Sequence, residues 1–113
     1  DFMDTDCSHC QQETPAVLRP LHAAYGDRVV FLSVDVGFIG PPDDFDDIRS
    51  FKTNFGASWT YVLDDGSVAP KYSVSSTPTT YILRGNLSVH SHFVGSSALS
   101  TLTSALDAAL GGG

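Results

Sequence analysis

The hydrophobic and polar positions of the chain predict alternating strands and helices. Residues 29–36 form a nearly continuous β-branched and aromatic run, typical of a strand buried on both faces of a parallel sheet. Residues 11–25 carry apolar side chains at three- and four-residue spacing, which predicts an amphipathic helix that ends at Gly26. Pro15 lies inside this helix and is expected to bend it, because proline lacks the backbone N–H.

The same patterns continue to the end of the chain. Asp43 or Asp44 can cap a second helix, and Gly56 is expected to end it. The later elements are an extended piece at 59–63, a helical turn at 67–72, paired strands at 77–83 and 87–94, and a last helix capped by Ser97. Residues 1–3 resemble the end of a strand whose beginning is missing. The order β-α-β-α-(β)-β-β-α predicts an α/β domain with an antiparallel hairpin at one edge.

Length and charge limit the possible functions. A chain of 113 residues is one domain, here 1–110, and the glycines at 111–113 are expected to form a flexible tail. The net charge of −7 argues against nucleic acid and anionic membranes as partners. No apolar run approaches the roughly 20 residues of a membrane span, so no direct membrane insertion is expected. We expect a monomer.

The candidate chemistry lies in Cys7-Ser8-His9-Cys10, which contains both cysteines of the chain. The first cysteine falls where a strand gives way to a helix, so the positive end of the helix dipole favours its thiolate. The second lies one turn further along and can attack a mixed disulfide formed by the first. The spacing therefore indicates a redox-active thiol pair.

Other interpretations of these motifs remain open. Zinc sites use the same cysteine spacing, but they normally need four ligands, and a second pair is absent from the sequence. A structural disulfide over so short a loop would restrain little of the unfolded chain. The acidic run of Asp43, Asp44, Asp46 and Asp47 is interpreted as a helix cap and solvated face, because it lacks the alternating ligands and glycine of a calcium loop. No metal ligands are assigned.

A family resemblance emerges when the motifs are taken in order. The segment 1–10 with Glu13-Thr14-Pro15 resembles the active-site segment of thioredoxin-fold proteins. Further motifs follow in the order seen in the TlpA/ResA-like branch of thiol-disulfide oxidoreductases: Val34-Asp35-Val36, Asp64-Asp65-Gly66, Tyr72-Ser73-Val74, Thr77-Pro78-Thr79 and Val94-Gly95. The resemblance implies a thioredoxin-like three-layer fold, a central mixed β-sheet flanked by helices, with a truncated N-terminal strand.

The resemblance also implies roles for particular residues. It makes Cys7 the attacking thiol and Cys10 the resolving thiol. Asp1 falls where thioredoxins keep a buried acid that assists proton transfer, and Glu13 falls in the Glu-x-Pro of the TlpA-like branch. The segment Thr77-Pro78 resembles the loop with the family's cis-proline, which faces the cysteines and presents backbone to the substrate peptide.

The sequence departs from the family pattern around the first cysteine. Asp6 stands where these reductases usually have tryptophan, and its charge, together with that of Asp4, opposes thiolate formation. Ser8 and His9 occupy the middle of the motif, and His9 resembles the second middle residue of DsbA-type oxidants. A thiolate stabilised by His9 would make the disulfide more oxidising. Because these influences oppose each other, the sequence leaves the direction of electron flow open.

We therefore expect a thiol-disulfide oxidoreductase that acts on protein thiols and disulfides together with a redox partner. It needs no cofactor beyond the Cys7–Cys10 disulfide. The alternative is a module that binds Cu(I) or another soft metal through Cys7, Cys10 and His9. Because TlpA-like proteins mostly work outside the cytoplasm, the resemblance favours an extracytoplasmic or membrane-tethered domain over a cytoplasmic one.

Overall fold

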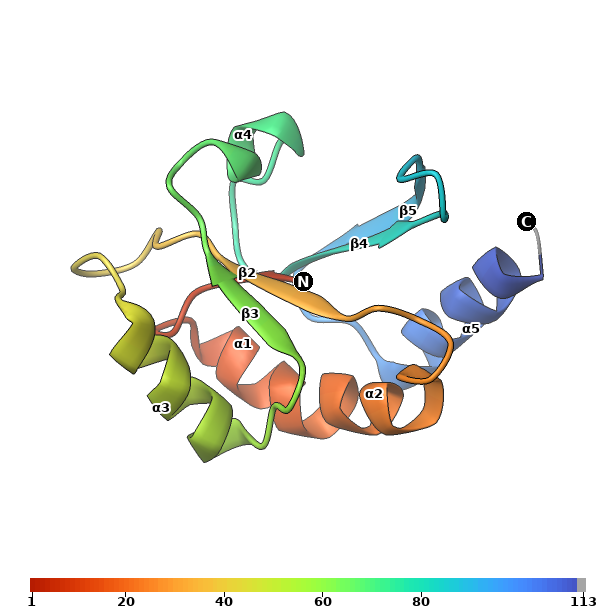
Figure 1. The fold of residues 1–113 in the computed structure, drawn as a ribbon, viewed down its shortest axis with the longest axis horizontal. Coiled ribbons are helices and arrows are strands. Elements are labelled where there is room, and N and C mark those ends of the chain that lie inside the picture. Colours follow the sequence, from red (N-terminus) through yellow and green to blue (C-terminus); the bar gives the residue numbers. More distant parts are fainter. Residues whose placement is uncertain (112–113) are drawn as a thin grey trace.

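The computed structural model describes residues 1–111, which form a mixed five-stranded sheet flanked by helices (Figure 1). The strands are β1 (Phe2–Met3), β2 (Leu32–Asp35), β3 (Thr60–Leu63), β4 (Thr79–Leu83) and β5 (Val89–Val94). Their spatial order is β3-β2-β1-β4-β5, with β1, β2 and β3 parallel and β4 antiparallel to both β1 and β5. The predicted α/β class is confirmed, and the two-residue β1 lies at the centre of the sheet.

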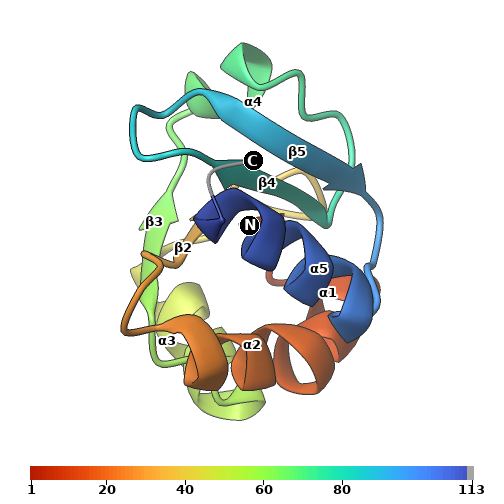
Figure 2. The same ribbon diagram turned by 90° about the vertical axis from the view of Figure 1, so that its right-hand side faces the viewer.

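Helices lie on both faces of the sheet. They are α1 (Ser8–Glu13), the π-helical segment η1 (Thr14–Leu18), α2 (Arg19–Tyr25), α3 (Phe45–Phe55), α4 (Val68–Lys71) and α5 (Leu99–Leu110). Figures 1 and 2 show α1, α2, α3 and α5 over one face and the short α4 over the other. Among residues 1–111, no helix is long and apolar enough to span a membrane.

The first helical run shows how local sequence shapes the structure. It begins at Ser8, three residues before the predicted start, because Cys7 serves as its N-cap. Pro15 lies in η1, where the helix widens to a π-helical turn. A proline has no N–H to donate to the preceding turn, so the regular hydrogen-bond ladder is interrupted at this point.

The two residues of β1 point to opposite faces and so connect the sheet to both layers. Met3 packs with both cysteines and with Phe51 of α3. Phe2 packs on the other side with Val34 and with Ala69 of α4. The chain leaves the sheet after Met3 and enters α1 at Cys7, so the cysteines are supported directly by the core.

The second predicted strand is shorter than expected. Strand β2 covers only Leu32–Asp35, and its Leu32 is half-exposed. The N–H groups of Arg28 and Val29 both donate to the carbonyl of Tyr25, so the start of the apolar run lies in the turn that follows α2. The run therefore contains a turn as well as a strand.

The helix caps were predicted with mixed success. Asp44 caps α3 through a capping box with Asp47, and Gly56 ends that helix with a left-handed φ of 71°. The expected Ser97 cap is wrong: the N-cap of α5 is Ala98, without a side-chain hydrogen bond. Of the predicted tail, Gly111 forms a turn after α5, and residues 112–113 lie outside the described part of the chain.

Candidate active site

The site is built around Cys7 and Cys10, which are joined by a disulfide. Cys7 is the extended N-cap residue of α1, and its Sγ accepts a hydrogen bond from the backbone N–H of Cys10 at 3.2 Å. The first turn of a helix offers N–H groups without intrahelical partners and a partial positive charge. This arrangement favours negative charge on the sulfur of Cys7 once the disulfide is reduced.

The motif has a buried half and an exposed half. Only 3% of Cys7 and 2% of Cys10 is exposed, whereas Ser8 and His9 are exposed between them. The predicted site residues Ser8 and His9 therefore lie on the solvent side of α1.

Glu13 lies on the same helix, three residues after Cys10, and is buried. Positions three apart share a helix face, so its carboxyl group belongs to the layer behind Cys10. Its Oε2 accepts the backbone N–H of Ser97 at 2.7 Å, while Oε1 has no hydrogen-bond partner within residues 1–111. Burial raises the pKa of Glu13, and the hydrogen bond from Ser97 partly opposes this shift.

Asp1 immediately precedes β1, and its carboxylate is part of a hydrogen-bond network. Its side chain is half-buried, and Oδ2 accepts a hydrogen bond from Ser33 Oγ at 2.6 Å. The same hydroxyl oxygen accepts the indole N–H of Trp59 at 2.8 Å. The carboxylate of Asp1 is thus tied to the interior of the sheet by a polar network.

Thr77 and Pro78 lie immediately before β4, and the peptide bond between them is cis. Phe2 of β1 pairs with Thr79 of β4 in antiparallel register. Residues before Thr79 therefore lie at the edge toward which β1 runs on its way to Cys7. The topology brings this predicted segment to the same edge of the sheet as the cysteines.

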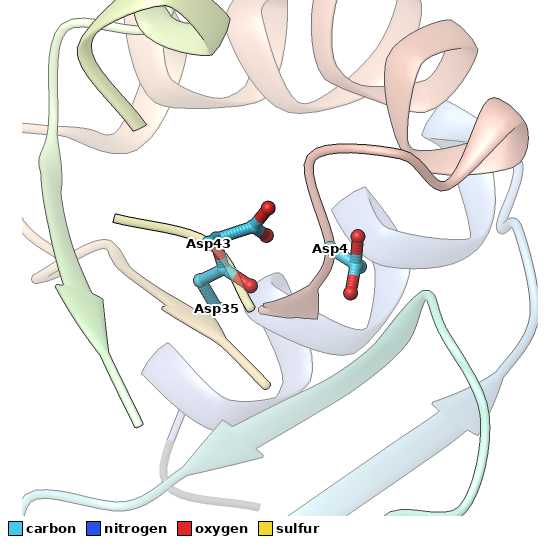
Figure 3. A group of neighbouring side chains, drawn as sticks. All are labelled: Asp4, Asp35 and Asp43. Atoms are coloured by element: carbon cyan, nitrogen blue, oxygen red, sulfur yellow. The ribbon is translucent and has the colours of Figure 1, made fainter. Parts of the chain in front are cut away.

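A group of carboxylates lies at the same edge and was not predicted as a site. Asp4, Asp35 and Asp43 each place one oxygen within 4.8 Å of the others (Figure 3). Asp4 and Asp35 are fully buried, and Asp43 is half-buried. Burial raises the pKa of Asp35 to about 8, and the neighbouring carboxyl groups of Asp43 and Asp4 act in the same direction. Among residues 1–111, these three could hold a metal ion.

The four aspartates at the start of α3 have different partners in the structure. Asp44 and Asp47 form the capping box, and Asp46 pairs with Arg49, as a cap and solvated face require. Asp43 departs from that interpretation because its Oδ1 accepts the hydroxyl of Thr5 at 2.7 Å. The sequence signal for the cluster was weak, since its three residues are separated by long stretches of chain.

A surface cavity of about 200 Å³ lies beside the cysteine segment. On one side it is lined by Thr5, Asp6 and Gln11, and on the other by residues of α3. Gln11 donates from Nε2 to the carbonyl of Thr5 at 2.8 Å, which fixes the chain before Cys7 against α1. The cavity is a recess next to the redox motif, with a lining of both polar and aromatic side chains.

Comparison with known proteins gives the fold a precedent. No family model matches the chain. The thioredoxin-like protein YneN of Bacillus subtilis (strain 168) is 30% identical over 83 residues, which make up 74% of this chain and 47% of that protein. The chain therefore spans about half the length of the curated relative that it matches.

Solved structures match over nearly the whole chain. A thioredoxin-like protein from Aeropyrum pernix has 25% identity and a TM-score of 0.81, covering 95% of this chain and 73% of that one. A secreted Mycobacterium tuberculosis disulfide oxidoreductase homologous to E. coli DsbE has 21% identity and a TM-score of 0.78, covering 95% and 77%. StoA from Bacillus subtilis has 19% identity and a TM-score of 0.77, covering 93% and 78%. The chain has the thioredoxin-like fold that its motifs predict.

Proposed function

We propose that this chain is a thiol-disulfide oxidoreductase of the TlpA/ResA-like type, which exchanges disulfides with protein substrates through Cys7 and Cys10. The proposal depends on the position of the Cys7–Cys10 disulfide at the start of α1 in a thioredoxin-like fold. The free N–H groups of that helix start are available to stabilise a Cys7 thiolate.

The exchange takes place in two balanced steps. In the reducing direction, the Cys7 thiolate attacks one sulfur of a substrate disulfide, and the other substrate sulfur leaves as a thiolate. The Cys10 thiolate then attacks Sγ of Cys7, forms the Cys7–Cys10 disulfide and releases the second substrate thiolate. Two electrons pass from the protein to the substrate. In the oxidising direction the same steps run in reverse.

The surrounding residues take supporting roles in this proposal. Glu13, whose Oε1 lacks a hydrogen-bond partner, supplies or accepts the proton of Cys10. Asp1, to which the resemblance assigns proton transfer, is held in place by the hydroxyl of Ser33. Ser8 and His9 meet the partner at the exposed side of the motif, and Thr77-Pro78 presents backbone to the substrate peptide.

The Cu(I) alternative is not favoured. One structural neighbour is itself described as a disulfide oxidoreductase. Protein dialysed without added metal should therefore cycle between dithiol and disulfide. Stoichiometric Cu(I) that survives dialysis, without any disulfide turnover, would favour the alternative.

Cysteine substitutions test the proposed mechanism. Cys10→Ser should still attack substrates, but it cannot release them, so mixed disulfides should accumulate on nonreducing gels. Cys7→Ser should abolish both attack and trapping, reducing turnover to the uncatalysed rate. Gln12→Ala, at an exposed position of α1 outside the motif, is the matched control and should retain turnover. Wild-type turnover by Cys7→Ser would falsify the proposal.

A further inference from the structure

Three carboxyl groups converge where the parallel strands β1 and β2 end. Asp35 is the last residue of β2, and it pairs in register with Met3 of β1. Asp4 follows Met3 and therefore leaves the sheet at the same edge. Asp43 reaches this edge from the loop before α3 (Figure 3). The carboxyl edge of parallel strands is where open α/β sheets commonly bind ligands.

The carboxyl group of Asp35 lacks the partners that its burial requires. Its Oδ1 accepts the backbone N–H of Gly37 at 3.0 Å, but its Oδ2 has no hydrogen-bond partner within residues 1–111. The residue is fully buried, and Figure 3 shows its carboxyl group beside those of Asp43 and Asp4. A buried carboxylate oxygen without a donor is unfavourable unless a proton or a cation neutralises it.

The protein itself supplies only neutral donors to these carboxylates within the described residues. Asp4 accepts the N–H groups of Asp6 and Ile39, and Asp43 accepts from Thr5. The ion pairs among residues 1–111 lie elsewhere, between Arg28 and Asp27 and between Arg49 and Asp46. Three neighbouring carboxylates therefore lack a cationic side-chain partner among the described residues, although hydrogen bonds hold each of them in place.

We propose that Asp4, Asp35 and Asp43 bind one divalent cation, and that Ca²⁺ is the cation that fits best. This site goes beyond disulfide exchange and does not depend on it. An all-oxygen set of carboxylates suits hard cations, not the soft metals that thiolates bind. The half-buried Asp43 leaves the cluster accessible to solvent, so water can complete the coordination shell.

The cluster suits the flexible coordination of Ca²⁺. Ca–O distances of about 2.3–2.6 Å allow oxygens on opposite sides of the ion to lie up to about 5 Å apart. That range includes every separation up to the 4.8 Å limit of this cluster. Mg²⁺ demands near-ideal octahedral geometry at about 2.0–2.1 Å and gives up its water reluctantly. Ca²⁺ should therefore bind more tightly than Mg²⁺.

The test is isothermal titration calorimetry, in which CaCl₂ is added to the EDTA-treated chain near neutral pH. We expect saturable binding of one Ca²⁺ per chain. Asp43→Asn and Asp35→Asn should each weaken it at least about tenfold, the lower limit seen even for groups that only support a metal ligand. Asp27→Asn, which removes one exposed acid outside the cluster, is the matched control and should bind like wild type.

A second measurement uses only the wild-type chain, so its result does not depend on whether the variants fold. At a Ca²⁺ concentration about 100 times Kd, the melting temperature should rise by on the order of 10 °C relative to NaCl of equal ionic strength. Excess chelator should reverse the rise. Absence of saturable binding, unchanged binding in Asp43→Asn, or tighter binding of Mg²⁺ than of Ca²⁺ would each overturn the proposal.

Discussion

Two groups of buried acids flank the cysteine pair, and the structure holds them in different ways. Behind Cys10, Glu13 is a single carboxyl group with one hydrogen bond, from Ser97. At the strand edge before Cys7, Asp4, Asp35 and Asp43 lie within reach of one another. One acid is isolated in the helix layer, whereas three acids gather among the loops.

The difference between them lies in what raises the energy of the charged form. For Glu13 the main cause is burial, which a single proton relieves. For Asp35, burial is joined by the charges of Asp43 and Asp4, so a cation relieves it as well as a proton. The isolated acid is therefore suited to proton transfer, and the cluster is suited to ion binding.

The largest expected effect is on the loop side, at Asp4. Asp4→Ala removes the acceptor of two backbone N–H groups, those of Asp6 and Ile39. Each hydrogen bond to a charged group is worth about 1.5–3 kcal/mol, and the lost repulsion offsets part of this. We expect a net loss of about 2–4 kcal/mol in the free energy of unfolding, measured by urea denaturation without divalent cations.

Asp4→Asn provides the matched comparison, since its amide keeps one acceptor oxygen. Its loss of stability should be about half that of Asp4→Ala. If Asp4→Ala proves more stable than wild type, repulsion between the carboxylates outweighs the hydrogen bonds.

A smaller effect is expected on the helix side, where Glu13→Gln keeps an acceptor for the N–H of Ser97. The folded-state pKa of Glu13 is raised above its unfolded value, so its contribution to stability is complete below about pH 4.3. This contribution is lost as pH rises through the folded-state pKa. Glu13→Gln should therefore be more stable than wild type above that range, by on the order of 1 kcal/mol.

The measurement is urea denaturation as a function of pH. Glu13→Ala is the control, because it also removes the acceptor for Ser97 and should cost about 1–3 kcal/mol relative to Glu13→Gln. Identical pH profiles for wild type and Glu13→Gln would show that Glu13 does not titrate differently on folding. Its assignment to proton transfer would then lose its basis.

The elements of the fold could be predicted because their signals are local. Periodicity placed the helices, and Gly56 and Asp44 marked the ends of α3. Ser97 satisfied the same local rule for a helix cap, but α5 begins one residue later, with Ala98 as its N-cap. The backbone N–H of Ser97 instead donates to Glu13, which is 84 residues away, and the local sequence contains no signal for this contact.

In the candidate site, too, local features could be predicted from the sequence, whereas contacts between distant segments could not. Cys7 and Cys10 lie three positions apart at one helix start, so the spacing alone predicts that they lie close together. The carboxylate cluster depends on strand register and on the path of the loop before α3, neither of which the periodicity specifies. Asp43 was interpreted with its acidic neighbours, although its side chain turns to Thr5.

The smallest expected effect is at the exposed side of the motif, where His9 and Asp6 act in opposite directions on Cys7. His9 lies on the first turn of α1, and a hydrogen bond or positive charge from its ring can stabilise the Cys7 thiolate formed on reduction. Both side chains are exposed, so water and salt screen them more than they screen the buried acids. For a two-electron couple, about 1.4 kcal/mol corresponds to roughly 30 mV, and we expect shifts no larger than this.

His9→Ala should lower the reduction potential in a glutathione titration, because the reduced form loses stabilisation. Asp6→Asn should raise the potential, because a nearby negative charge is removed. If His9→Ala leaves the potential unchanged or raises it, the tuning of Cys7 comes from the helix start and the buried acids, without a contribution from the exposed side chains.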